Sequence, residues 1–211
     1  YGPAGIEEFI TANIKVLNVR LPFPVFITIV NEGNVVIEKD YQVKCCDAQH
    51  GVPAFSYSFE ENERSGVFYP DKAKKLGIPE GKLWQELQNG NTIEIDGRRI
   101  DSSQVTGEKR SGKKIGISGD TRPTQKLEDF FKNSDYLSFD CTFLFDLKDR
   151  AIETNHSTAK EAAELAKNAN VKNLILTHFS ARYADESVLL KEAKEIHESV
   201  IAAKDLLEVE I

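Results

Sequence analysis

The chain has 211 residues and a formal net charge of −7, and 40% of its residues are hydrophobic while 29% are charged. These values are typical of a soluble globular protein, and the length suits one large domain or a core with a sizeable insertion. Because no apolar run approaches the ~18 residues of a membrane span and no signal-peptide pattern opens the chain, we expect a cytoplasmic protein with no membrane partner.

The first part of the chain is predicted to be one helix followed by short strands. Apolar residues recur at helical spacing over residues 3–17, and Glu7 and Glu8 lie in the first turn, where the helix dipole favours anions. Branched residues predict a hairpin of strands 25–30 and 34–38. Two further strands are expected over residues 41–46 and 54–59.

Residues 60–91 change character, because they are rich in glycine and proline and carry the only tryptophan, Trp84. Two short helices are predicted there, over residues 71–76 and 83–88. Such a segment between sheet strands is predicted to be an inserted, flexible arm. A hairpin should follow over residues 92–100, since Asp96-Gly97 favours a tight turn.

Basic residues are concentrated in this part of the chain. Residues 64–114 hold eleven Lys or Arg against seven Asp or Glu, although the whole chain is acidic. A partner that carries phosphates would meet this segment. Charge alone equally allows an ordinary solvated surface.

From residue 114 onward, predicted strands and helices alternate, which indicates an α/β layered sandwich. The strands are expected over residues 114–117, 136–139 and 172–176, with one or two more within 200–210, and the helices over 124–132, 158–169 and 186–198. Thr158 and Glu161 fit a capping box, so His156 is expected on the loop before that helix, whereas His197 is expected on the surface.

Three predicted strands end just before a residue that can bind a metal. His50, Asp120 and His178 follow the apolar strands that end at residues 46, 117 and 176. Imidazole and carboxylate groups that converge at strand ends are the ligands that zinc and similar cations select. Taken singly, each of the three also fits an ordinary hydrogen-bonded residue at a strand end. The three cysteines, Cys45, Cys46 and Cys141, lack a zinc-ribbon spacing and are predicted to be buried thiols.

Four motifs in the second half carry a resemblance to a known family. They are SGDTRP at residues 118–123, DCTF at 140–143, HST at 156–158 and LTHFSARY at 176–183. In this order they resemble the motifs of tRNase Z, the tRNA 3′-processing endonuclease of the metallo-β-lactamase superfamily. The resemblance implies a metallo-β-lactamase αββα sandwich with an arm insertion, and a precursor tRNA as substrate.

The resemblance also implies the chemistry. Two zinc ions per subunit are expected, with Mn²⁺ or Mg²⁺ as further options; the histidine matching His50 binds one ion, that matching His178 binds the other, and Asp120 bridges them. Asp140 and His156 match the acidic residue and histidine that protonate the leaving 3′ oxygen. Asp140 is a departure, because the family usually has Glu there, preceded by His where this chain has Phe139.

For RNA binding, the resemblance points to Ser180, Arg182 and Tyr183 beside the predicted metal ligand, since Arg grips phosphate and aromatic rings stack on unpaired bases. Without the family, a structural role for Arg182 is equally compatible with the sequence. The arm matches the family's tRNA-binding exosite, in which Lys82 replaces a usual proline. Family members are usually homodimers, so a homodimer is expected.

One family motif is absent. The sequence starts at Tyr1, contains no methionine and lacks the upstream His-x-His-x-Asp-His string that supplies further ligands to both ions. We therefore expect the domain to be N-terminally incomplete. A protein that truly began at Tyr1 should lack stable dizinc binding and cleave negligibly.

The leading hypothesis is a metal-dependent endoribonuclease that removes the 3′ trailer from precursor tRNA. One alternative is a superfamily phosphodiesterase or esterase that acts on small substrates and needs no arm. Another is a catalytically degenerate RNA-binding subunit, which the missing motif and the Phe139-Asp140 departure would explain.

Overall fold

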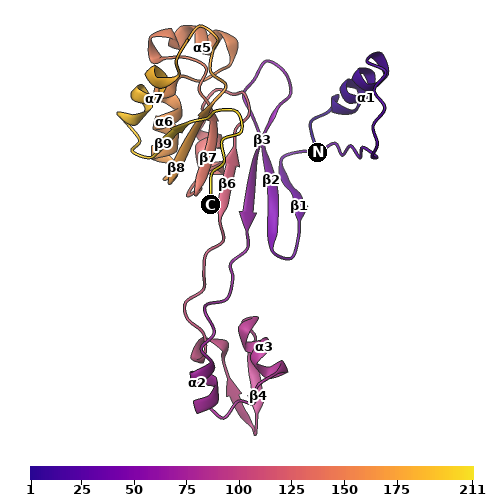
Figure 1. Cartoon of the computed structure of the whole chain (residues 1–211), viewed down its shortest axis with the longest axis vertical. Coiled ribbons are helices and arrows are strands. Elements are labelled where there is room, and N and C mark those ends of the chain that lie inside the picture. The colour runs from indigo at the N-terminus through magenta and orange to yellow at the C-terminus, as the bar shows by residue number, and fades with distance from the viewer. The chain divides into compact units, whose positions relative to one another are not determined.

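The computed structural model describes residues 1–211 and divides them into two compact units (Figure 1). The main unit combines residues 1–60 with residues 113–211, and the inserted unit spans residues 61–112. None of the helices has the length and apolar sequence that crossing a bilayer requires.

The main unit is built on a seven-stranded mixed sheet with the strand order β1-β2-β3-β6-β7-β8-β9. Strand β1 is antiparallel to β2, and β3 is antiparallel to β6, whereas β6 to β9 run parallel to one another. The bounds are β1 Gly33–Ile37, β2 Tyr41–Asp47, β3 Phe55–Glu61, β6 Lys114–Ile117, β7 Tyr136–Asp140, β8 Asn173–Thr177 and β9 Val200–Ala202. The parallel strands confirm the predicted α/β class.

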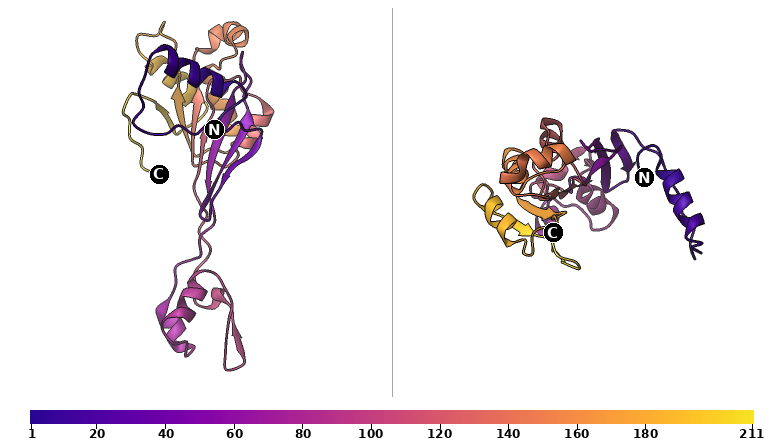
Figure 2. Two further views of the ribbon diagram at one scale, coloured as in Figure 1. Left: turned by 90° about the vertical axis from the view of Figure 1, so that its right-hand side faces the viewer. Right: turned by 90° about the horizontal axis from the view of Figure 1, so that it is seen from above.

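Helices cover the parallel part of the sheet and bury its apolar residues. Figure 2 shows them in pink, orange and yellow beside the strands. They are α4 Gln125–Phe130, α5 Lys148–Thr154, α6 Ala159–Asn168 and α7 Ser187–Lys194, and the short 3₁₀ turn η2 Phe145–Leu147 precedes α5. Helix α6 buries a row of alanines whose small side chains let it lie close to β7 and β8. The capping box predicted at Thr158 and Glu161 is present.

A close contact requires glycine at residue 116 of β6. A Cβ atom there would lie 2.4 Å from Cδ1 of Phe131, which is fully buried in the core. Any larger residue would have to displace this ring or the strand. The position of β6, and of the loop that follows it, therefore depends on this contact.

Two local predictions are wrong. Residues 25–30 form no strand, since only Ile29 makes a bridge, to Gly2, and the hairpin is made instead by β1 and β2. Phe26 is 86% exposed, so this stretch buries little that would hold it in a sheet. His197 is buried, not on the surface, because α7 ends at Lys194 and the His197 Nε2 atom lies 2.9 Å from the carbonyl oxygen of Val171.

The predictions for the N-terminal helix and for the cysteines are confirmed. Helix α1, Ile6–Val16, lies within the predicted range of residues 3–17. All three cysteines are buried and free. Burial raises the pKa of Cys46 to about 12, so this thiol stays protonated near neutral pH and is a poor metal ligand.

The inserted unit has a small apolar core of its own. It contains α2 Pro70–Lys75, α3 Lys82–Gln88, the hairpin of β4 Ile93–Ile95 and β5 Arg98–Ile100, and the 3₁₀ turn η1 Ser102–Gln104. Trp84 packs beside Phe68, and its Nε1 atom donates to the carbonyl oxygen of Ile78 at 3.0 Å. The unit runs past residue 91, the predicted end of the arm, because Ile93 and Ile100 of the hairpin belong to this core.

Candidate active site

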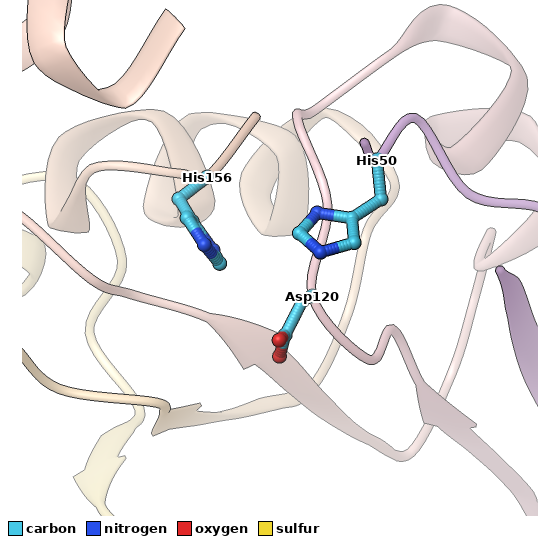
Figure 3. Close-up of side chains that lie close together, drawn as sticks. All are labelled: His50, Asp120 and His156. Carbon is cyan, nitrogen blue, oxygen red and sulfur yellow. The ribbon is translucent and has the colours of Figure 1, made fainter. Parts of the chain in front are cut away.

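His50 and Asp120 lie on loops that follow β2 and β6. Figure 3 shows their side chains turned toward each other and toward His156. The Nδ1 atom of His50 lies 3.3 Å from the carbonyl oxygen of Asn155. Asp120 follows Gly119, whose φ of +62° is a left-handed conformation that glycine adopts without strain. The turn at Gly119 thus brings Asp120 to the same edge of the sheet as His50.

His178 directly follows β8 and has an unusual backbone conformation. Its φ is +62°, a value that costs energy for a residue other than glycine and that clusters at functional sites. The side chain is half-exposed, and its Nε2 atom lies 3.4 Å from Oδ2 of Asp120. The ring stacks on that of His156 with 4.7 Å between the centroids.

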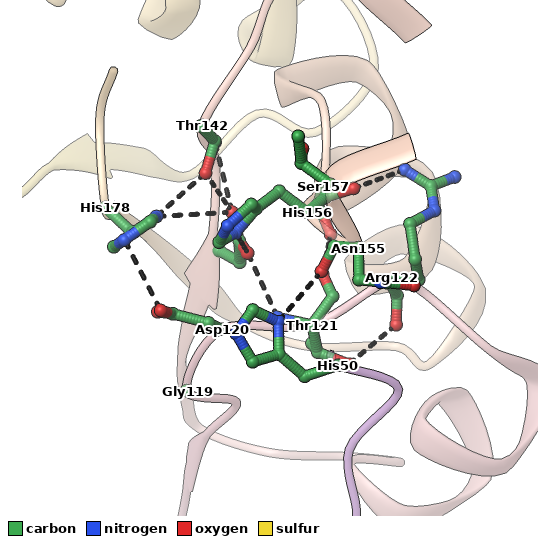
Figure 4. Close-up of polar contacts among 12 residues, drawn as sticks. His50, Gly119, Asp120, Thr121, Arg122, Thr142, Asn155, His156, Ser157 and His178 are labelled. Carbon is green, nitrogen blue, oxygen red and sulfur yellow. Dashed lines mark hydrogen bonds and ion pairs between the residues drawn. The ribbon is translucent and has the colours of Figure 1, made fainter. Parts of the chain in front are cut away.

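Asp140, at the end of β7, is fully buried and accepts hydrogen bonds on both oxygens. Its Oδ1 accepts from the backbone N–H and the hydroxyl of Thr142, at 3.1 and 2.7 Å. Its Oδ2 accepts from the backbone N–H of Thr121 and lies 2.7 Å from Nδ1 of His156. Figure 4 shows this network, which satisfies the buried carboxylate and holds His156 in place.

These side chains form two overlapping groups that could hold a cation. The potential ligand atoms of His50, Asp120 and His156 lie within 4.8 Å of one another, and so do those of Asp140, His156 and His178. Asp120 lies close to both His50 and His178, but neither group contains all three predicted metal ligands. The residue that the two groups share is His156, which was predicted to protonate the leaving oxygen and not to bind a metal. Imidazole nitrogens with carboxylate oxygens are a donor set that suits zinc and similar divalent cations.

A buried ion pair fixes the loop that carries His156. Arg122 donates from Nη1 to the carbonyl oxygen of His156 at 2.5 Å and to Oε2 of Glu161 at 2.9 Å, and its Nη2 also contacts Glu161. Burial raises the pKa of Glu161, but the hydrogen bonds and positive charge of Arg122 outweigh this effect and leave that pKa below its usual value. Arg122 therefore ties the loop of Asp120 to the loop of His156.

The predicted RNA-binding residues in the loop after β8 make contacts with other residues of the chain. Arg182 donates from Nε to the Ser180 hydroxyl at 3.1 Å, and its guanidinium lies 4.9 Å from the centroid of the Phe143 ring. The Tyr183 hydroxyl accepts from the backbone N–H of Leu144 at 2.9 Å, and its ring packs against the main core. Lys82 is the first residue of α3 in the inserted unit.

Sequence reasoning missed the residues that support the site. Thr121 and Thr142 donate to Asp140, and Thr142 also contacts His178. The Asn155 carbonyl oxygen contacts His50. None of the three was singled out for such a role. Thr121 and Thr142 stand inside the motifs at residues 118–123 and 140–143, so their position was a signal. However, Thr121 reaches Asp140 over 19 residues, and Thr142 reaches His178 over 36 residues.

The chain is similar to curated proteins named Ribonuclease Z. It is 59% identical over 211 residues to that of Nitrosopumilus maritimus, covering all of this chain and 71% of the relative. It is 40% identical to that of Methanosarcina acetivorans, covering 100% and 70%, and 39% identical to that of Brevibacillus brevis, covering 98% and 67%. No family model matched the chain.

Solved structures support the fold. The short form of human tRNase Z superposes with a TM-score of 0.58 at 21% identity, covering 97% of this chain and 64% of that one. A metallo-β-lactamase fold protein from Bacillus subtilis superposes with a TM-score of 0.59 at 17% identity, covering 95% and 59%. The chain has the metallo-β-lactamase fold and belongs to the ribonuclease Z family.

Proposed function

We propose that the protein is a metal-dependent endoribonuclease that cuts precursor tRNA at the 3′ end of the acceptor stem and releases the 3′ trailer. The observation that carries this proposal is the convergence of His50, Asp120 and His178 beside the Asp140–His156 pair, in a chain that is 59% identical to a Ribonuclease Z. Hydrolysis of a phosphodiester needs a nucleophile, charge stabilisation and protonation of the leaving oxygen, and this site has residues suited to each need.

The metal ligands in the proposal are His50, Asp120 and His178, and zinc is the proposed cation. Two bound cations would supply a hydroxide nucleophile at neutral pH and would stabilise the charge on the phosphate. Asp120 has two carboxylate oxygens and can therefore contact both ions. These three residues offer few ligands for two ions, so we expect residues 1–211 by themselves to bind metal weakly and to have little activity.

In this proposal the Asp140–His156 pair donates the proton. The carboxylate of Asp140 holds Nδ1 of His156 at 2.7 Å, which leaves Nε2 of the imidazole free to deliver a proton to the leaving 3′ oxygen. Asp140 is one methylene shorter than Glu, yet the hydrogen bond is short. The shorter side chain is therefore compatible with this role.

RNA contacts belong to the same proposal. Ser180, Arg182 and Tyr183 directly follow the β8 ligand His178, so they are placed to meet the RNA 3′ end, and the inserted unit, including Lys82, would bind the body of the tRNA. Lys74 and Lys82 of the inserted unit are exposed, as phosphate contacts require. A homodimer and a cytoplasmic location complete the proposal.

The test is cleavage of a precursor tRNA with a 3′ trailer by the full-length gene product, with and without added zinc. We expect a cut at the end of the acceptor stem that Asp120→Asn abolishes. Replacing residues 61–112 by a short linker should abolish cleavage of precursor tRNA but preserve hydrolysis of a small phosphodiester. Equal loss of both activities would argue against a substrate-binding arm, and RNA binding without any cleavage would favour a non-catalytic subunit.

A further inference from the structure

Thr142 connects the buried carboxylate of Asp140 to the histidine at the end of β8. Its hydroxyl oxygen lies 2.7 Å from Oδ1 of Asp140 and 2.8 Å from Nδ1 of His178 (Figure 4). A hydroxyl group has only one hydrogen to donate, so it can donate to only one of these two neighbours. The direction of that donation decides which nitrogen of His178 carries a proton.

The surroundings of Asp140 settle the direction. Backbone N–H groups of Thr121 and Thr142 donate to its two oxygens, one to each, and backbone N–H groups can only donate. This arrangement suits a carboxylate, which accepts and does not donate. The hydrogen of the Thr142 hydroxyl therefore points to Asp140, and the lone pair of the Thr142 oxygen faces His178.

The consequence is a defined tautomer of His178. A hydroxyl oxygen that already donates to Asp140 can only accept from the imidazole, so Nδ1 of His178 carries the hydrogen. The Nε2 atom then has a free lone pair, and it is the atom that lies 3.4 Å from Oδ2 of Asp120. A metal ion needs an unprotonated imidazole nitrogen, and this tautomer offers one on the Asp120 side.

The other two histidines are held differently. Nδ1 of His50 faces the carbonyl oxygen of Asn155, and Nδ1 of His156 faces the carboxylate of Asp140, so both partners are pure acceptors. The hydroxyl of Thr142 could accept or donate, and only its contact with Asp140 makes it an acceptor toward His178. Because the His178 side chain is 45% exposed, solvent can compete for its Nδ1 atom.

We propose that Thr142 is a positioning residue that, together with Asp140, fixes His178 as the tautomer with Nδ1 protonated and Nε2 free for a divalent cation. This inference rests on the proposed function, because it assigns His178 to the metal centre. The Asp140 carboxylate contacts His156 directly and orients His178 through the Thr142 hydroxyl. A single buried group thus orients the proton donor and a metal ligand together.

The proposal predicts a clear effect of removing one hydroxyl. Thr142→Val keeps the shape of the side chain but cannot accept from His178. Loss of such an outer hydrogen bond to a metal-binding histidine typically lowers metal affinity about 10- to 100-fold. Thr142→Ser retains the hydroxyl and should keep zinc affinity within about threefold of the wild type, which separates the hydroxyl from the methyl group.

The most direct experiment measures the tautomer by ¹⁵N NMR of the histidine rings in the metal-free full-length protein at neutral pH. We expect Nδ1 of His178 to be protonated in the wild type and in Thr142→Ser, and Nε2–H to become populated in Thr142→Val. The resonance is assigned by its loss in His178→Gln. Zinc titrations of the same proteins, with free zinc set by a competing chelator, should show the 10- to 100-fold change.

A wild-type His178 with its proton on Nε2 would overturn the proposal, and this result does not depend on whether Thr142→Val folds. Equal zinc affinity of folded Thr142→Val and the wild type would also overturn it. Neither measurement uses RNA. If the protein failed to cleave precursor tRNA while His178 showed the expected tautomer, the proposed function would fail and the assignment of Thr142 would stand.

Discussion

The two units of the chain differ in where their polar groups lie: the main unit buries a set of them, whereas the inserted unit keeps almost all of them on its surface. In the main unit, Arg122, Asp140 and Glu161 are all at most 9% exposed and form a connected set of hydrogen bonds around His156. In the inserted unit, Thr106 is the only buried polar residue, and an ion pair such as Lys74–Glu80 lies on the surface. Buried polar groups fix a geometry, whereas exposed charges stay available to a partner.

The charge of the inserted unit supports this contrast. Residues 61–112 contain nine Lys or Arg and nine Asp or Glu, so the unit as such is neutral. The basic surplus expected from residues 64–114 comes half from Lys113 and Lys114, which pair with Asp135 and Glu60 of the main unit, and half from leaving out the acidic Glu61 and Glu63. Any attraction of this unit for phosphate must therefore come from local patches and not from its net charge.

Breaking the buried ion pair should give the largest effect. Arg122→Met leaves Glu161 buried without its partner and frees the loop of His156, so the free energy of unfolding should fall by about 3–5 kcal/mol. Urea unfolding followed by far-UV circular dichroism measures this loss. Lys148→Ala is the matched control, because Lys148 lies 3.8 Å from the same carboxylate but is 46% exposed. A loss as large in the control would contradict the distinction between buried and exposed partners.

A cavity in the core of the inserted unit should destabilise this unit and leave the main unit unchanged. Leu87→Ala removes a fully buried side chain from the small core and should cost about 2–5 kcal/mol. Trp84 is the only tryptophan and lies in this core, so its fluorescence reports the unfolding of the inserted unit alone. We expect the fluorescence transition to move to lower urea while the amide-exchange protection of β7 and β8 is unchanged. Parallel loss in both units would show that they unfold together.

Acid should weaken the main unit through Glu161. The folded pKa of Glu161 lies below its ordinary value of 4.5, so its stabilisation is complete above that value and is lost as the pH falls through the lowered folded pKa. The side chain of residue 161 cannot titrate in Glu161→Gln. The stability of this variant should therefore decline less between pH 6 and pH 3, although at pH 6 it is lower than that of the wild type. Thermal unfolding at a series of pH values tests this slope, and identical slopes would rule out the contribution.

The smallest effect is expected on the surface of the inserted unit. The atoms of Lys74 and Glu80 are 3.2 Å apart, but their side chains are 60% and 66% exposed, so water and salt screen the pair. A double-mutant cycle with Lys74→Ala and Glu80→Ala should give a coupling of at most about 1 kcal/mol. A larger coupling would mean that this ion pair also has a structural role.

Local signals in the sequence predicted much of the main unit. The Thr158–Glu161 capping box depends on residues three apart, and it was predicted correctly together with the loop position of His156. Apolar strands followed by His50, Asp120 and His178 also marked one edge of the sheet. The strand prediction for residues 25–30 was wrong because a strand needs a neighbouring strand to pair with, and branched side chains alone do not provide one.

Tertiary contacts account for what the sequence did not reveal. Arg122 and Glu161 are 39 residues apart, and Thr142 and His178 are 36 apart, so no spacing rule links them. His197 was misplaced for the same reason, since its burial depends on where α7 stops and on the carbonyl group of Val171. The polar groups that support the site therefore became visible only in the folded chain.

The central proposal is that His50, Asp120 and His178 bind the metal with which the protein cuts precursor tRNA. The most direct test measures bound zinc and cleavage rate together in the full-length gene product, for the wild type and for Asp120→Asn. Asp120→Asn removes the carboxylate that would hold the cations, so we predict that bound zinc and the cleavage rate fall together. A thousandfold lower rate corresponds to the loss of about 4 kcal/mol of transition-state stabilisation, and we expect a loss of that order. Unchanged cleavage by an Asp120→Asn protein that binds no zinc would contradict the account.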